Sequence, residues 1–329
     1  MATRRILIIG GTGTISSPIS RLAVERGWDV TLLNRGTQST RPVVEGARSL
    51  VGDASDPASL RAAVGDEEFD VVANFRSFLP AQAAADVELF AGRTGQYVYI
   101  SSASAYQKPI AQLPIVESTP LHNPFWQYSR DKAASEAVLM DAYRERGFPV
   151  TIVRPSHTYD AAMIPLDGGW TTLQRMREGR PIVIHGDGTS WWALTHARDL
   201  APAFVGLLGN PHALGAAVHI TSEESLTWDA IAQLLGRALG VEPTIVHVAS
   251  EAIAAVRPEA AGGLLGDKAH SVRFDNSRIR SLVPGWVAPT GFAEGAREIV
   301  EWHLADPERQ RVDPELDAAL DRIIERFGA

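Results

Sequence analysis

The sequence contains no cysteine among its 329 residues. This absence excludes disulfide bonds, thiolate metal sites and a cysteine nucleophile, and it fits a cytoplasmic protein, which is the compartment that we expect. The uninterrupted apolar runs are far shorter than the roughly 20 residues of a membrane-spanning helix, so we expect no membrane partner. Residues 1–10 form a basic start that passes directly into a strand, so we expect no signal peptide.

Positive charge is also scarce. Lysine and arginine number 31 against 39 aspartates and glutamates, which gives a net charge of −8. This balance disfavours a phosphate backbone as a partner, so we expect no nucleic acid. Only three of the basic residues are lysines, namely Lys108, Lys132 and Lys268. No two histidines have metal-ligand spacing with a carboxylate nearby, so we expect no metal.

The first half of the chain alternates strands with helices. Solid apolar runs such as "DVTLL" and "YVYIS" are typical of parallel strands that are buried on both faces of a sheet. Parallel strands are joined by right-handed crossovers, here through helices. The predicted strands are 5–9, 29–33, 48–51, 70–74, 96–101 and 150–154. The predicted helices are 14–26, 57–65, 80–91 and 124–147.

The regular alternation breaks after "IVRPS". We predict loops at 160–170 and 262–271, helices at 171–178, 196–208 and 315–327, and strands at 181–184 and 217–220. The fold prediction is α/β: a Rossmann-type doubly wound parallel sheet with a smaller C-terminal α/β substrate domain. The dinucleotide-binding domain is assigned to residues 1–160, with a return at about 195–225, and the substrate-binding domain to 161–194 and 226–329.

The stretch "ILIIGGTGTIS" (6–16) places glycines between a strand and a helix. Gly10 allows a tight turn, and Gly13 lets the backbone approach a pyrophosphate at the start of the helix that begins near Thr14. Ser16 stands where a third glycine often permits close packing of the helix on the strand. The alternative is a tight connection without a ligand. We predict that this loop binds a dinucleotide through Gly10, Thr12, Gly13, Thr14 and Ile15.

The end of the second strand, "LLNRG", bears on the choice of dinucleotide. NAD sites usually carry an acidic residue there, whereas this chain has Asn34 and Arg35. Because Arg35 can pair with a 2′-phosphate, NADP is slightly favoured over NAD. Alternatively, Arg35 stacks on the adenine or faces solvent. Asp53, in "VGDASD", either contacts the adenine amino group or caps the helix that begins near Pro57.

Tyr128 and Lys132 in "YSRDK" lie four residues apart in a predicted helix, so their side chains share one face. A tyrosine with an ordinary pKa near 10 is a poor base at neutral pH, and a neighbouring ammonium lowers that pKa. Ser102, at the end of "YISSASAY", is placed to hydrogen-bond the same substrate oxygen. The alternative is that Tyr128 is an aromatic residue of the helix surface. We predict Ser102, Tyr128 and Lys132 as the catalytic residues.

The chain resembles the extended, or atypical, short-chain dehydrogenase/reductase family, the NAD(P)-dependent epimerase/dehydratases. The matching stretches are "GGTGTIS", "GDASD", "YISSASAY", "YSRDK", "RPSHTY" and "GDGTSWWALTHARDLA". The resemblance implies that Ser102 orients the substrate oxygen, that Tyr128 transfers the proton and that Lys132 holds the nicotinamide ribose. It also implies that Pro155 lines the nicotinamide pocket. The form "GGTG…LLNRG" is most similar to a divergent subgroup with epimerase-like bacterial proteins and chloroplast RNA-binding relatives. We expect a homodimer.

Two departures from this family narrow the reaction. Sugar dehydratases of the family carry an Asp–Glu pair after the catalytic Ser/Thr, whereas Ala103 and Ser104 stand there. Without these carboxylates the chain lacks an acid/base pair for elimination of water. Nucleotide-sugar enzymes of the family carry an arginine where Trp192 stands. An indole stacks on a sugar face but makes no charged phosphate contact; alternatively, Trp192 only packs between the domains.

The predicted function is that of an NAD(P)-dependent epimerase or oxidoreductase acting on a hydroxyl or ketone carbon of a sugar or polyol derivative. The alternatives are an NADPH-dependent ketone reductase and a non-catalytic dinucleotide- or RNA-binding relative. We expect His196 to orient a loop and Asp199 to cap a helix. Further cofactor contacts are expected at Ala54 and Asn74. The expected substrate-contacting residues are Phe75, Ser104, His157, Trp170 and Trp192.

Overall fold

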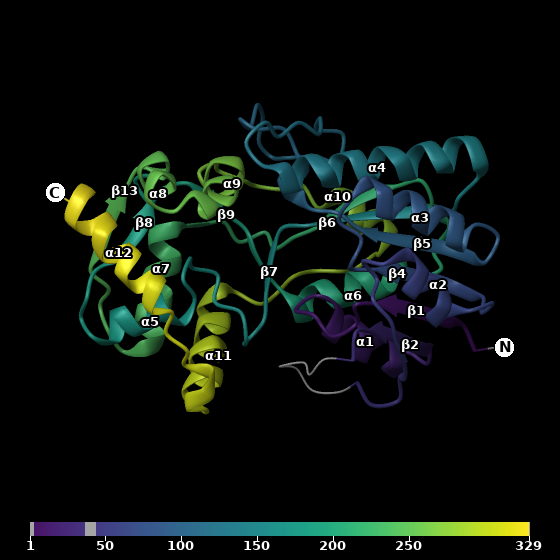
Figure 1. The fold of residues 1–329 in the computed structure, drawn as a ribbon, viewed down its shortest axis with the longest axis horizontal. Helices are drawn as coiled ribbons and strands as arrows, with labels where there is room; N and C mark the ends of the chain where they lie inside the picture. Colours follow the sequence, from purple (N-terminus) through teal and green to yellow (C-terminus); the bar gives the residue numbers. More distant parts are fainter. Residues whose placement is uncertain (1–2, 37–43, 329) are drawn as a thin grey trace.

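A computed structural model describes residues 3–36 and 44–328 of the chain. One lobe is built on a seven-stranded parallel sheet with the strand order β11-β6-β5-β4-β1-β2-β3, and most of the C-terminal elements form a second lobe (Figure 1). This order confirms the predicted Rossmann-type doubly wound sheet. The strands are β1 (Arg5–Ile9), β2 (Asp29–Asn34), β3 (Arg48–Val51), β4 (Phe69–Asn74), β5 (Thr94–Ile100), β6 (Val150–Pro155) and β11 (Ala217–Ile220).

Helices cover both faces of this sheet, which explains why its strands are apolar without alternation. In β1, Ile6 and Ile8 face the core under α1 and α6, whereas Leu7 and Ile9 face the core under α2, α3 and α4. All four side chains are fully buried, and each contributes about 1.5–3 kcal/mol of transfer free energy. The helices are α1 (Ser16–Glu25), α2 (Pro57–Val64), α3 (Pro80–Phe90), α4 (Gln127–Arg146) and α6 (Ala197–Leu207).

The second lobe contains short strands and amphipathic helices around its own apolar core. The final helix is docked on this core by Arg175, which pairs with Asp317 and Asp321 at 2.6 and 2.7 Å. The elements of this region are β7 (His157–Tyr159), α5 (Trp170–Arg177), β8 (Ile182–His185), β9 (Trp191–Trp192), β10 (Leu194–His196), β12 (Leu226–Thr227), α7 (Trp228–Leu239), β13 (Ile245–Val248), α8 (Ser250–Val256), α11 (Phe292–Leu304) and α12 (Pro314–Phe327).

The predicted loop at 262–271 is wrong for most of its length. The segment forms α9 (Ala261–Gly263) and a π-helical turn over Leu264–Lys268. The glycines of this segment allow it to pack closely on Trp126, because a Cβ at Gly262 would lie only 2.3 Å from that side chain. Close packing on another element therefore stabilises a helical turn that glycine content alone disfavours.

Two further expectations are corrected by packing. Helix α6 is capped by His196, whose Nδ1 accepts the N–H of Arg198, whereas the Asp199 carboxylate accepts hydrogen bonds from Thr290. The predicted domain ranges also omit a third contribution to the sheet lobe. Helix α10 (Ser277–Leu282) lies within residues 226–329 but packs against α6 and β11.

The order of the strands in the sheet determines where a ligand site can form. All seven strands run parallel, so their carboxyl ends lie along one edge, and the connections from β1 and β4 leave that edge in opposite directions. Gly10 directly follows β1, Phe75 directly follows β4, and Ser102 is the second residue after β5. Residues distant in the sequence are therefore gathered at one edge of the sheet, where ligands of this fold class bind.

Candidate active site

The glycine loop opens onto a cavity of about 500 Å³. Gly10 has φ +80°, and a Cβ there would lie 2.6 Å from Cγ of Arg76, so this position requires glycine. Ser16, which replaces the third glycine, donates to the carbonyl of Gly10 at 2.6 Å and accepts the N–H of Gly13 at 2.8 Å. Its hydroxyl therefore closes the loop instead of merely fitting beside the strand.

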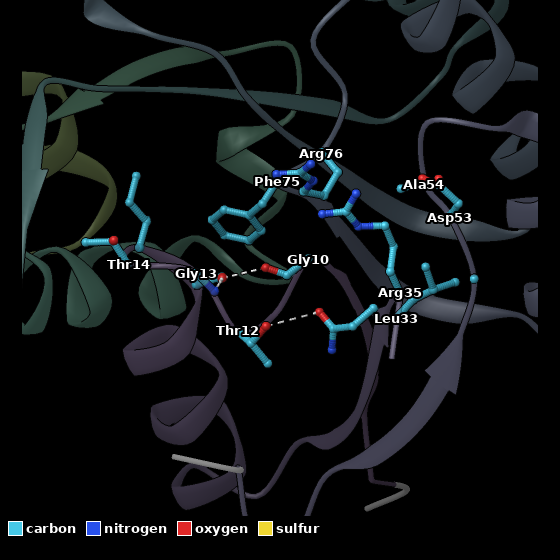
Figure 2. A pocket seen from close by; sticks show the side chains of 14 residues that line it. Gly10, Thr12, Gly13, Thr14, Leu33, Arg35, Asp53, Ala54, Phe75 and Arg76 are labelled. Carbon is cyan, nitrogen blue, oxygen red and sulfur yellow. Dashed lines mark hydrogen bonds between the residues drawn. The ribbon is translucent and has the colours of Figure 1, made fainter. Parts of the chain in front are cut away.

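Most of the predicted cofactor residues line this cavity. The structure brings together Gly10, Thr12, Gly13, Thr14, Ile15, Asn34, Arg35, Asp53 and Ala54 (Figure 2). Thr12 hydroxyl donates to Asn34 Oδ1 at 3.4 Å, which ties the loop to the end of β2. Asp53 does not cap α2, because Asp56 does so by accepting the N–H of Ala58.

Two arginines reach the same end of this cavity. Figure 2 shows the side chains of Arg35, after β2, and Arg76, after β4, among the lining residues. Hydrogen bonds from Ser55 lower the pKa of Asp53, and both guanidinium groups act in the same direction. With two guanidinium groups near one carboxylate, this end of the cavity carries net positive charge. The sequence pointed to Arg35 but not to Arg76, because the residues that follow a strand do not reveal the direction of their side chains.

Asn74 is not placed at the cofactor cavity. Its Nδ2 donates to Asp86 at 3.0 Å, and its Oδ1 accepts the N–H of Arg76 at 2.8 Å. The side chain is buried. Asn74 therefore orients the turn that carries Phe75 and Arg76, and the expectation of a direct cofactor contact is corrected.

A second cavity, of about 410 Å³, holds the predicted catalytic residues. Ser102, Tyr128 and Lys132 all line it, as do Pro155 and His157. Both cavities include Ile15 and Phe75 among their lining residues, so they meet at these two side chains. Phe75 therefore lies at the junction of the two cavities, next to Phe204 with a ring-centroid distance of 5.5 Å.

A chain of serine hydroxyls orients Ser102. Ser129 Oγ donates to Ser104 Oγ at 2.8 Å, and Ser104 Oγ lies 2.9 Å from Ser102 Oγ. The Ser104 carbonyl accepts a hydrogen bond from Asn123 at 2.9 Å, and Ser104 is only 3% exposed. Ser104 lines the cavity, as expected, but its hydroxyl is also engaged in holding Ser102.

The electrostatics of Tyr128 and Lys132 differ from the sequence-based expectation. Burial raises the pKa of Tyr128, although hydrogen bonding with Ser102 acts in the opposite direction. Burial also lowers the pKa of Lys132 to about 7, with Glu136 opposing it. Lys132 Nζ donates to the carbonyls of Ser77 and Ile100 at 2.8 and 2.7 Å. The net effect on Tyr128 is therefore to favour the protonated phenol, which is opposite to the predicted lowering.

His157 and Trp192 form a hydrogen-bonded pair in the wall of this cavity. Trp192 Nε1 donates to His157 Nδ1 at 3.0 Å, which leaves the imidazole proton on Nε2. Burial lowers the pKa of His157 to about 3, so the ring is neutral at physiological pH. Trp192 is 2% exposed and its ring lies 5.2 Å from that of Trp228. Trp192 thus belongs to the apolar core of the second lobe and also lines the cavity.

Trp170 is not part of the cavity and is corrected as a substrate contact. Its ring stacks on His303 at 5.3 Å with an interplanar angle of 11°. It begins α5 and belongs to the apolar core of the second lobe. A large aromatic residue in a core helix gives no signal in the sequence that separates packing from substrate contact.

Sequence reasoning also missed the π-helical turn that closes the second cavity. Asp267 and Lys268 line the cavity, and Trp126 packs beside Tyr128 with a ring-centroid distance of 4.9 Å. Two features of the sequence could have pointed to this segment: the glycines around "GDK" and the scarcity of lysine in the chain.

The described residues contain neither a cluster of three metal-ligating side chains nor a helix long and apolar enough to cross a membrane.

The residues present fit a dinucleotide. The cradle at Gly10 and Gly13 is open to a backbone approach, and the N-terminal N–H groups of α1 face it. The two cavities adjoin at Ile15 and Phe75, with the glycine loop lining the first and Tyr128 lining the second. The first cavity would hold the phosphates and adenosine, and Lys132 with Pro155 would border the nicotinamide half.

Comparisons with known proteins agree with this fold. The chain is 28% identical to 2′-dehydrokanamycin reductase of Streptomyces kanamyceticus, over 99% of this chain and 92% of that protein. It is 29% identical to the chloroplast stem-loop binding protein of 41 kDa b of Arabidopsis thaliana, over 74% of this chain and 66% of that protein, just under two thirds of its length.

The solved structures show the same fold. An epimerase from Methanothermobacter thermautotrophicus superimposes with a TM-score of 0.76 at 17% identity and covers 93% of this chain and 94% of its own. The model of the NAD dependent epimerase/dehydratase family matches residues 6–220, which is more than half of the chain. The chain therefore belongs to the NAD dependent epimerase/dehydratase family, a group of enzymes with an NAD(P)-binding Rossmann fold.

Proposed function

We propose that the protein is an NADP-preferring oxidoreductase that acts on a hydroxyl or ketone carbon of a sugar or polyol derivative. One observation carries the proposal. Ser102, Tyr128 and Lys132 line a single cavity that joins the glycine-loop cavity at Ile15 and Phe75. A hydride donor or acceptor and a proton-transfer group would then face the same substrate carbon and oxygen.

The roles follow from the contacts of each residue. A nicotinamide bound at the junction would supply or accept the hydride. Ser102, held by Ser104, orients the substrate oxygen, and Tyr128 transfers the proton to or from it. In its protonated form, Lys132 has a third N–H for the ribose hydroxyls beyond the two that it donates to backbone carbonyls.

The protonation state of Tyr128 favours the direction of ketone reduction. Burial keeps the proton on the phenol, and a protonated phenol is the form that donates a hydrogen bond and then a proton to a ketone oxygen. The relative that matches almost the whole chain is named a reductase. Exchange of the dinucleotide at each turnover separates a reductase from an epimerase, which regenerates and keeps its dinucleotide.

The proposed substrate is not a nucleotide sugar. Trp192 occupies the position at which nucleotide-sugar enzymes of the family carry a diphosphate-binding arginine, and it is buried between His157 and Trp228. The proposed reaction is also not a dehydration, because Ala103 and Ser104 replace the acidic pair and Ser104 is hydrogen-bonded to other serines. Hydride and proton transfer remain.

The NADP preference rests on two guanidinium groups. Arg35 and Arg76 both border the first cavity, and both lower the pKa of Asp53. Both guanidinium groups therefore act on the part of the cavity next to Asp53. A 2′-phosphate would pair there with arginine, whereas the 2′-hydroxyl of NAD would find no strand-end carboxylate at Asn34.

A binding function without catalysis is the second candidate, because one relative is named a chloroplast stem-loop binding protein. The net charge of −8 weighs against an RNA backbone as partner. The catalytic set and the serine chain that orients it also have no purpose in a protein that only binds RNA. Binding of an RNA stem-loop at physiological salt, without turnover of any ketone, would favour this second candidate.

The test compares Tyr128→Phe with Tyr143→Phe, a matched control on the same helix α4. The protein is purified under native conditions, and mass spectrometry identifies the retained dinucleotide and any bound small molecule. Turnover of that molecule and of a panel of polyols and ketoses is followed through NADPH absorbance. Tyr128→Phe should lower turnover by about 10²–10⁴-fold, the usual contribution of positioned acid–base catalysis. Unchanged turnover in Tyr128→Phe would refute the proposal.

A further inference from the structure

All three lysines of the chain meet at the second cavity. Lys132 and Lys268 line it, and Lys108 lies behind the wall with its Nζ 3.6 Å from Asp267 Oδ1. The other 28 basic residues of the count of 31 are arginines, so this grouping is specific to one place in the fold. Lys132 belongs to the proposed catalytic set, but Lys108 and Lys268 have no role in it.

The segment that carries Asp267 and Lys268 is held tightly against the catalytic helix. Asn123 Nδ2 donates to the carbonyl of Gly266 at 2.7 Å. A Cβ at Gly266 would lie 2.8 Å from Cβ of Trp126, so the two backbones approach as closely as glycine allows. The π-helical turn is therefore anchored next to Trp126, the neighbour of Tyr128. Such turns often occur at functional sites.

Lys268 is fixed from its other side as well. Its backbone carbonyl accepts hydrogen bonds from three side chains: His185 Nε2 at 3.1 Å, Ser190 Oγ at 3.0 Å and Trp228 Nε1 at 3.2 Å. Three donors on one carbonyl hold the backbone of this residue rigidly. Its half-buried side chain is therefore presented from a fixed point of the cavity wall.

The charges of this cluster do not balance inside the protein. Asp267 is paired with Lys108, whose side chain is fully buried and whose Nζ has no hydrogen-bond partner in the described structure. Within residues 3–36 and 44–328, the ammonium of Lys268 makes neither an ion pair nor a hydrogen bond. It nevertheless lies close enough to lower the pKa of His157. Lys268 also acts on the carboxylate of Asp267, which Lys108 already faces, so two ammonium groups share one carboxylate and the wall carries an excess of positive charge.

We propose that Lys268 binds an acidic group of the substrate, a carboxylate or a phosphate monoester, so that the preferred substrate is an anionic sugar derivative. An amine is disfavoured, because the only carboxylate lining this cavity, among the described residues, already faces Lys108. A cationic substrate would also meet Lys268 and Lys132. The inference deepens the proposed function and rests on it for the identity of the bound molecule as a substrate.

The test measures binding separately from turnover. Calorimetry titrates the protein–NADP+ complex, at constant ionic strength, with D-gluconate, D-glucose 6-phosphate, sorbitol and D-glucosamine. The variants are Lys268→Gln, which removes the charge, Lys268→Arg, which keeps it, and Arg273→Gln. Arg273 is an exposed cation five residues further along and serves as the matched control.

The expected result is that gluconate or glucose 6-phosphate binds at least about 10-fold more tightly than sorbitol and glucosamine. Lys268→Gln should weaken the preferred anion by about 10–100-fold, the usual effect of losing a charge-assisted hydrogen bond. Lys268→Arg should restore most of the affinity, and Arg273→Gln should leave it unchanged. The stronger of the two anions shows whether the acidic group is a carboxylate or a phosphate.

Tighter binding of glucosamine or sorbitol, absence of anion binding, or anion binding that survives Lys268→Gln would each overturn the inference. These outcomes are distinguishable from failure of the proposed function. Turnover of a neutral polyol that depends on Tyr128 would leave the proposed function standing and the inference refuted. Anion binding that depends on Lys268, without turnover that depends on Tyr128, would do the reverse.

Discussion

Replacing Lys132 by methionine should change the stability of the protein by an amount that depends strongly on pH. Lys132 is 2% exposed, and burial lowers its pKa from the ordinary 10.5 to about 7. Between these two pH values the unfolded chain binds a proton that the folded chain does not bind. The contribution of Lys132 to stability therefore rises with pH across this window, and the ammonium destabilises the fold most below pH 7.

The pKa of Lys132 sets the size of the effect. Each pKa unit corresponds to about 1.4 kcal/mol, so the fall from 10.5 to about 7 corresponds to roughly 5 kcal/mol between the two limits. Between about pH 6.5 and 9, the accessible part is roughly 2–3 kcal/mol. Methionine also leaves the carbonyls of Ser77 and Ile100 without their donor, which lowers the stability of the variant at every pH.

Urea unfolding at several pH values, followed by tryptophan fluorescence, measures the free energy of unfolding of both proteins without dinucleotide. The stability of Lys132→Met relative to the unmutated protein should fall as the pH rises. The control is Arg144→Met on the same helix, whose exposed guanidinium pairs with Asp141 at the surface. A stability difference for Lys132→Met that is as independent of pH as that of the control would refute the reasoning.

Arg35→Ala and Arg76→Ala should each weaken NADP+ by about 1–3 kcal/mol and barely change NAD+ in fluorescence titrations, because each removes a guanidinium from the same end of the cavity; equal affinities of the unmutated protein for both dinucleotides would contradict this. UDP and UDP-glucose should bind more weakly than about 1 mM in calorimetry, because Trp192 lacks a charge, and tight UDP-dependent binding would disprove the assignment. Glu136→Gln should lower the free energy of unfolding in urea by about 3–5 kcal/mol, because it leaves the buried guanidinium of Arg154 without its charged partner at 2.6 Å. A decrease below about 1 kcal/mol would contradict the importance of this ion pair.

Features that depend on a few consecutive residues could be predicted from the sequence. All seven strands of the sheet were predicted within a few residues, and six of them as apolar runs, because strands buried on both faces need continuous apolar side chains; the edge strand β3 is the exposed exception. The glycine loop and the four-residue spacing of Tyr128 and Lys132 were equally readable. A turn with positive φ at Gly10 and one face of a helix are properties of a few consecutive residues.

The tertiary structure alone decided which distant residues join the site and in what electrical state. Arg76, Asp267 and Lys268 enter the cavities through turns whose direction depends on packing, whereas Trp170 packs in the core of the second lobe. The direction of the pKa shift of Tyr128 was likewise set by burial. Desolvation depends on every atom around a group, and a linear sequence does not record that environment.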